Sequence, residues 1–121
     1  MRNFKELDVW VESVKLVEEI YDVSSGFPRD EIYGLTSQIR RAMVSVASNI
    51  SEGCGRRTSK DFVSFLYNSV GSAKEVDCQL IIANRLKYLE KKKFEELEND
   101  VNKLIGMLMR FIHYVSERDV V

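Results

Sequence analysis

Residues 34–53 read GLTSQIRRAMVSVASNISEG, and this stretch decides the fold. At roughly 100° per residue, one face of a helix over this region collects only apolar side chains. These are Ile32, Leu35, Ile39, Ala42, Val46 and Ile50. A polar row borders that face at spacings of three and four, namely Gln38, Arg41, Ser45, Asn49 and Glu52. The stretch therefore predicts a long helix that ends at a glycine and has an ordered polar edge.

Three further stretches repeat apolar residues every three or four positions, from Leu7 to Tyr21, from Phe62 to Ala83 and from Phe94 to Val115. This period is typical of amphipathic helices. The four predicted helices span about 4–24, 30–53, 59–86 and 91–117. Short connections between them predict an all-α fold, an antiparallel up-down-up-down four-helix bundle that forms a single domain over residues 1–121.

Local signals mark where these helices begin and end. Thr58 and Asp61 are typical of an N-cap and its partner three residues later, and Asn3 with Glu6 has the same spacing. Gly26 suits the left-handed residue that often ends a helix. We therefore expect helix starts near residues 4 and 59 and a helix end near residue 25.

Composition excludes several classes of protein. The chain has 121 residues, 45% of them apolar and 31% charged, which is typical of one globular domain. Its net charge of −1 gives no global basic field. No apolar run approaches the ~18–20 residues that cross a bilayer, and no secretory signal opens the chain. We expect a cytoplasmic protein without a membrane partner, in which Cys54 and Cys78 are reduced thiols.

Catalytic patterns are weak. His113 is the single histidine and points away from the apolar face of its helix, so the paired Glu-x-x-His pattern of di-iron bundles fails. No glycine-rich phosphate loop is present. We therefore expect no enzyme, no catalytic residue, no metal and no cofactor. The alternative is a site between subunits, with Asn49, Glu52 and Glu75 as oxygen ligands.

Basic residues gather in one region. Residues 40–60 contain five cationic residues and one anionic residue, Glu52. Three of the cations, Arg56, Arg57 and Lys60, fall near the start of the third helix. Arginines and helix N-termini both suit phosphate. The alternative is a solvated loop whose charges serve solubility.

Two polar rows suggest a structural network between the second and third helices. Because antiparallel pairing sets Gln38 level with Ala73, we expect hydrogen bonds across this seam, where each unpaired buried group would cost about 1–3 kcal/mol. The predicted network comprises Gln38, Arg41, Ser45, Asn49, Glu52, Ser72 and Glu75. The alternative is two ordinary solvated flanks.

Apolar residues also exceed one seam per helix. The surplus rows are Val9, Leu16, Ile20 and Val23, and Val63, Tyr67 and Val70. Exposed apolar rows of this size mark interfaces, so we expect a homo-oligomer. The alternative is a broad core face within one compact bundle.

Several motifs then support a family resemblance. They are Phe4-x-x-Leu7-x-Val9-Trp10, Phe27-Pro28-x-x-Glu31-x-Tyr33-Gly34-Leu35-Thr36-Ser37-Gln38-Ile39-Arg40-Arg41-Ala42, Ser45-x-x-x-Asn49-Ile50-x-Glu52-Gly53, Phe62-x-x-Phe65-Leu66, Gly71-Ser72-x-x-Glu75 and Leu86-x-Tyr88-Leu89. Over about residues 4–89 the chain resembles the bacterial four helix bundle protein family, also called the ribosomal-RNA intervening-sequence protein family. One departure is Val46, where many members carry proline.

The resemblance implies an all-α bundle that assembles into a ring, a pentamer in known relatives. The accessory variability proteins of diversity-generating retroelements are similar, and they bind nucleic acid and a reverse transcriptase through a basic surface. By position, the nucleic-acid-binding candidates here are Arg41, Arg56, Arg57 and Lys60. The first hypothesis is a non-enzymatic homo-oligomer that binds structured RNA or DNA. The alternative is a protein-interaction scaffold, an accessory to the protein of a neighbouring gene.

Overall fold

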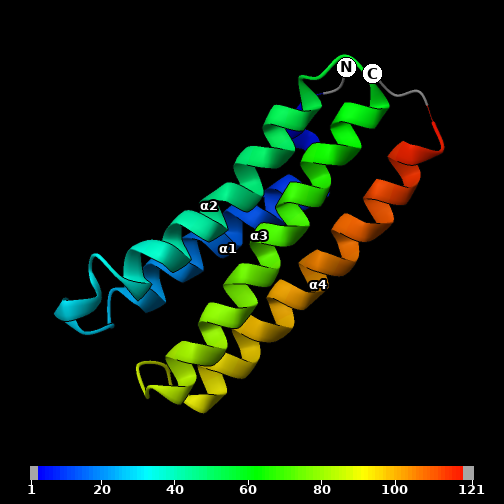
Figure 1. The fold of residues 1–121 in the computed structure, drawn as a ribbon. Helices are drawn as coiled ribbons and strands as arrows, with labels where there is room; N and C mark the ends of the chain where they lie inside the picture. Colours follow the sequence, from blue (N-terminus) through cyan, green and yellow to red (C-terminus); the bar gives the residue numbers. More distant parts are fainter. Residues whose placement is uncertain (1–2, 119–121) are drawn as a thin grey trace.

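The computed structural model describes residues 3–118 and contains four long helices. They are α1 (Asp8–Ser24), α2 (Leu35–Cys54), α3 (Ser59–Arg85) and α4 (Lys91–Ser116), with short 3-10 helices at Phe4–Glu6 (η1) and Arg29–Glu31 (η2). Successive helices run antiparallel (Figure 1). Across the described residues, each long helix packs against its two neighbours around a square and none reaches its diagonal partner. The predicted four-helix bundle is confirmed.

The bundle therefore has four sides, each named here by the two helices that form it. It also has two ends. The tip is the end with the α2–α3 connection, and the described chain starts and stops there (Figure 1). The closed end carries the α1–α2 and α3–α4 connections. Within residues 3–118, none of the helices combines the length and apolar character that a membrane crossing requires.

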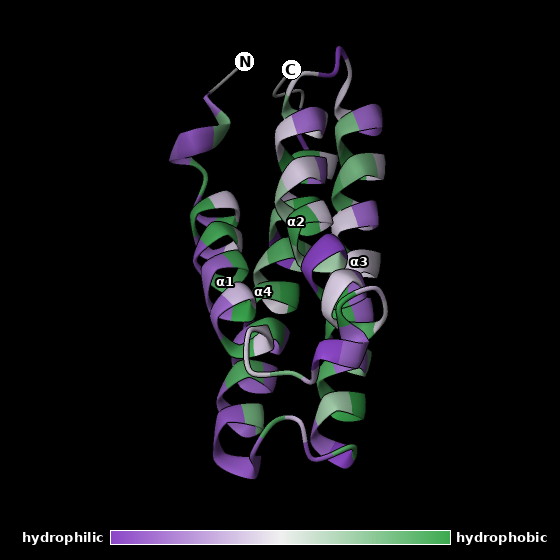
Figure 2. Ribbon diagram, turned by 90° about the vertical axis from the view of Figure 1, so that its left-hand side faces the viewer, coloured by the Kyte–Doolittle hydropathy of each residue, from purple (hydrophilic) through white to green (hydrophobic). Residues whose placement is uncertain are grey.

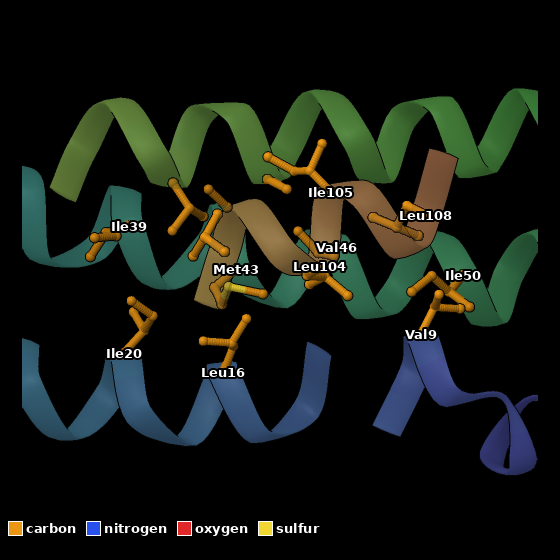
Figure 3. Packing of buried hydrophobic residues seen from close by; sticks show 14 of the residues in the cluster. Val9, Leu16, Ile20, Ile39, Met43, Val46, Ile50, Leu104, Ile105 and Leu108 are labelled. Carbon is orange, nitrogen blue, oxygen red and sulfur yellow. The ribbon is translucent and has the colours of Figure 1, made fainter. Parts of the chain in front are cut away.

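The core fills the space between the helices, and Figure 3 shows side chains of α1, α2 and α4 meeting there. Val9, Leu16 and Ile20 are all at most 5% exposed. The prediction that this row is surplus was wrong for α1. In the row from Leu7 to Tyr21, Leu7 is buried, but Trp10, Val14 and Val17 are only partly buried and Tyr21 is 44% exposed. Hydrophobic and hydrophilic bands alternate along each helix, as amphipathic helices require (Figure 2).

Helix starts and ends differ from the predictions at three places. Leu7 is extended, so η1 is separate from α1, and the Asn3 side chain accepts from Lys5 N–H within η1. Ile32 is 56% exposed because the chain still turns before α2 begins at Leu35. No described glycine has a positive φ, so the left-handed prediction for Gly26 was wrong. The predicted N-cap of α3 is confirmed, since Thr58 Oγ1 accepts from Asp61 N–H at 3.1 Å.

Gly53 allows α2 and α3 to approach closely next to the tip. A Cβ atom at this position would lie 2.7 Å from Phe65 Cβ and 3.0 Å from Phe62 Cδ1. Contacts this short require movement of a neighbour, and Phe65 Cβ is fixed to the α3 backbone. The glycine therefore sets the distance between the two helices where the chain reverses.

Hydrogen bonds join the two connections at the closed end. Glu31 Oε1 accepts from Leu35 N–H at 3.0 Å, which satisfies a free donor at the start of α2. Its other oxygen accepts from Tyr88 O–H at 3.0 Å, and this bond raises the pKa of the Tyr88 hydroxyl. Asn84 Nδ2 donates to Leu89 O at 3.0 Å, which holds the turn in which Lys87 has a φ of 65°. One carboxylate thus links segments that are 57 residues apart.

Candidate nucleic-acid interface

The tip brings together three of the four predicted nucleic-acid-binding cations, Arg56, Arg57 and Lys60. All three are exposed. The chain reverses tightly there, because Gly55 N–H donates to Glu52 O at 3.1 Å and Arg56 N–H donates to Gly53 O at 3.0 Å. The cations consequently flank the N-terminus of α3, where the helix dipole favours an anion.

Aromatic rings hold two guanidinium groups at the tip. Arg56 lies over Phe65, with 4.5 Å from its guanidinium carbon to the ring centroid. Arg118 lies over Tyr114 at 4.2 Å and donates to the Tyr114 carbonyl at 3.3 Å. Stacking on a ring leaves the in-plane N–H donors of a guanidinium available for a planar acceptor such as phosphate.

Arg118 is a tip residue that the sequence analysis missed. Ser59 Oγ donates to the Arg118 carbonyl at 2.9 Å, so the last described residue lies next to the start of α3. The signal that could have found it is the antiparallel topology, which places the end of the fourth helix beside the start of the third. The tip therefore draws its cations from α3, α4 and the α2–α3 connection.

Acidic residues reduce the local charge. Glu52, Asp61 and Glu117 are exposed at the same end, as are Glu6 and Asp8, and they offset much of the positive charge there. Glu117 is paired with His113 at 3.5 Å. Among residues 3–118, none of the four tip cations forms an ion pair. The tip is thus a small surface of cations without ion pairs in the described chain.

Arg41 lies apart from the other three predicted cations. It belongs to the second turn of α2, and the length of helix from Arg41 to Cys54 is about 20 Å at 1.5 Å per residue. Its side chain is exposed on the α2–α3 side. The grouping in sequence therefore combined two separate surfaces.

The α2–α3 side contains a short hydrogen-bonded chain rather than a long seam. Ser45 Oγ and Ser72 Oγ lie 3.0 Å apart, and Asn49 Nδ2 donates to Ser45 O at 2.9 Å and to Ser45 Oγ at 3.0 Å. Farther from the tip, an open hollow of about 400 Å³ is lined by Gln38, Arg41, Ala42, Ser45, Ser72 and Glu75.

Four members of the predicted network stay outside this chain. Gln38, Arg41, Glu52 and Glu75 are exposed, and no hydrogen bond or ion pair joins their side chains within residues 3–118. Water satisfies polar groups at such positions, so pairing is not required there. Glu52 lies close to the tip, three residues after Asn49, and the structure does not bring it to Glu75.

Few groups in the described region are arranged for catalysis. His113 is exposed and its nearest charged partner is Glu117. Within residues 3–118, no three His, Cys, Asp or Glu side chains gather in a way that could hold a metal ion. Cys54 is buried and Cys78 is exposed. The arrangement that stands out chemically is the set of ring-supported cations at the tip, which suits phosphate binding.

Comparisons with known proteins concern the whole chain and its fold. Residues 5–110 match the 23S rRNA-intervening sequence protein family. The fold is similar to the crystal structure of a protein of unknown function from the S23 ribosomal protein family of Bacteroides thetaiotaomicron. That match has a TM-score of 0.80 and 22% sequence identity, and it covers 86% of this chain and 97% of the other. No curated protein matches the chain. The chain belongs to the 23S rRNA-intervening sequence protein family.

Proposed function

We propose that this protein is a non-enzymatic homo-oligomeric bundle that binds structured RNA or DNA through its tip. The observation that carries the proposal is the set of four exposed, unpaired cations at one end, two of them stacked on aromatic rings. Phosphate contacts supply most of the affinity for nucleic acid, and arginine is suited to them.

One tip is a weak site, because exposed carboxylates at the same end offset much of its positive charge. Several copies in one assembly would present several tips to the same nucleic acid. Linked weak contacts can raise the overall affinity by about 10²–10⁴ without any new contact. Self-association is therefore part of the proposal. The surface around Arg41 lies far from the tip and is not part of the proposed nucleic-acid interface.

The test compares the same charge change at the two ends of the bundle. R56E/R57E should abolish an electrophoretic shift of a structured RNA, whereas K91E/K92E at the start of α4 should leave it unchanged. Lys91 and Lys92 are exposed at the closed end, so both variants alter the net charge equally. Wild-type binding should weaken with salt, with a log–log slope of about −0.9 per phosphate contact on duplex DNA. Absence of any shift at low salt would overturn the proposal.

A protein-interaction scaffold is the second candidate, and an exposed apolar pair at the closed end favours it. Tyr33 is 94% exposed and the adjacent Ile32 is 56% exposed. Exposed apolar groups of this kind mark sites for partner proteins. Co-purification with the protein of a neighbouring gene, lost in Tyr33→Asp and kept in R56E/R57E, would support this candidate over nucleic-acid binding.

A further inference from the structure

Two opposite sides of the bundle carry apolar side chains that the described chain leaves partly uncovered. On the α1–α2 side, an open hollow of about 340 Å³ is lined mainly by Phe4, Trp10, Val14, Val17 and Val44. On the α3–α4 side, Tyr67 is 52% exposed and Met109 is 42% exposed. Since the helices form a square, these two sides face away from each other.

The positions of two neighbours place Tyr67 on the α3–α4 side. Val63 lines a hollow together with Ser116 of α4, and Tyr67 follows it one helical turn later. Residues four apart lie on the same stripe of a helix. Farther along this stripe, Asp77 Oδ2 accepts from Asn102 Nδ2 of α4 at 3.3 Å.

We propose that the α3–α4 side of one copy docks on the α1–α2 side of a second copy, with Tyr67 entering the apolar hollow. The inference rests on the self-association in the proposed function and assigns its two surfaces. Heights along the bundle support it. Tyr67 lies eight residues from the start of α3 and Ala47, in the hollow, seven from the end of α2. At 1.5 Å per residue, both are about 10–12 Å from the tip.

Each side carries a charged group that could pair with a group on the other side. The carboxylates of Asp77 and Glu98 share the α3–α4 side, and Asp77 Oδ1 is buried without a hydrogen-bond partner. The pKa of Glu98 is raised, first by a hydrogen bond to Asp77, then by burial and by the charges of Asp77 and Glu95. Within the described chain, no cation forms an ion pair with Asp77 or Glu98.

Arg40 supplies a cation at a similar height on the α1–α2 side. Its guanidinium lies 4.6 Å from the Tyr21 ring centroid, donates to Ser24 Oγ at 2.8 Å and donates to Tyr21 O at 3.2 Å. A guanidinium has five N–H donors, so further donors are available. Arg40 and Asp77 are about 21 and 27 Å from the tip at 1.5 Å per residue, close enough for long side chains to meet.

The geometry of the contact determines the kind of assembly. Each copy uses two different and opposite surfaces, so the contact is heterologous. Such contacts build a ring or an open array, and they do not form a twofold dimer. The α2–α3 side with its polar hollow remains free in this arrangement, as does each tip.

The contact also makes self-association depend on pH. In the free copy, Glu98 holds its proton to a higher pH than an ordinary glutamate. A neighbouring guanidinium favours the charged carboxylate, so docking releases the proton. Association should therefore strengthen as the pH rises through the raised pKa of Glu98, and Glu98→Gln should remove this dependence.

The test is the mass in solution, measured by light scattering and sedimentation for variants that keep the wild-type circular dichroism. The wild type should contain more than two copies. Tyr67→Asp should shift the assembly to single copies, with a dissociation constant raised at least about tenfold. Tyr33→Asp is the matched control, because Tyr33 is exposed on the closed end and should not change the mass. Arg40→Glu and Glu98→Arg should each weaken the assembly, and the double variant should restore it.

The outcomes separate the inference from the proposed function. An oligomer that Tyr67→Asp and the two charge reversals leave intact would overturn the docking assignment while self-association stands. A wild type that stays a single copy at every concentration would remove self-association itself, and RNA binding by single tips would still be measured independently. Dispersal by Tyr67→Asp with rescue in the double charge reversal supports the assignment.

Discussion

Both ends of the bundle carry polar residues, but the two ends use them differently. At the closed end, Glu31, Asn84 and Tyr88 bond to groups in other segments, and both connections are fixed. At the tip, Arg56 and Arg118 lie on aromatic rings, and Arg57 and Lys60 extend into solvent. Polar groups that are already bonded contribute to the fold, whereas groups left with free donors can bind a ligand.

The largest expected effect is on the free energy of unfolding and comes from the close packing at Gly53. Gly53→Ala should destabilise the protein by about 1–3 kcal/mol, because the new methyl group overpacks against Phe65 and Phe62. Thermal unfolding would measure the loss. The matched control is Gly71→Ala, where a Cβ atom meets nothing within 4 Å and the higher helix propensity should add up to about 1 kcal/mol. Equal effects of the two changes would contradict the close contact at the tip.

Arg118 tests whether the tip extends to α4. Arg118→Glu should weaken RNA binding by about tenfold and reduce the salt slope by about one phosphate contact. Lys91→Glu, an equal charge change at the closed end, should have no effect on either. Titration of a labelled RNA at several salt concentrations measures both quantities. A salt slope that Arg118→Glu leaves unchanged would restrict the interface to the α2–α3 connection.

Glu31 tests whether the polar groups of the closed end stabilise the fold without contributing to RNA binding. Glu31→Ala removes the acceptor for Leu35 N–H, and loss of such a cap costs about 1 kcal/mol. Urea unfolding should show this loss, while RNA affinity should match that of the wild type. The neighbouring Asp30→Ala is the control for charge, since Asp30 is exposed. A fall in RNA affinity with Glu31→Ala would break the division between the two ends.

The smallest expected effect is the alkaline dependence of the closed end. Because Glu31 raises the pKa of Tyr88, the folded protein holds this proton more tightly than the unfolded chain. The stabilisation is complete below the ordinary tyrosine pKa of about 10 and is lost as the pH rises through the raised pKa. Urea midpoints should therefore fall more between neutral and alkaline pH for the wild type than for Tyr88→Phe. Tyr33→Phe, which alters an exposed tyrosine, should behave as the wild type.

The helices could be predicted from the sequence because apolar spacing and capping are local. Which face of α1 is buried could not be predicted from the sequence, because its two rows are almost equally apolar. Only the positions of α2 and α4 decide which row enters the core. The same limit explains Arg41. Arg41 was grouped with Arg56 because the two are close in sequence. A helix separates residues by a fixed rise per residue, so the two side chains lie far apart along α2 in the bundle.

Contacts between distant segments were also beyond prediction from spacing. The Glu31–Tyr88 bond joins two motifs of the family resemblance, yet nothing in either motif states that they meet. Arg118 became a tip residue only through the antiparallel return of α4. Sequence periodicity predicts the elements, and their ends and edges, where binding groups lie, depend on how the elements are placed.

The described chain starts and stops at the tip, and this affects how the protein can be handled. A purification tag or fluorescent fusion placed directly before or after the described residues would begin near the arginines, where a polyhistidine or acidic sequence would add its own charge to the measured affinity. A label inserted in the α3–α4 connection would sit at the far end instead. Cleaved, untagged protein is therefore the right material for every binding measurement on this bundle.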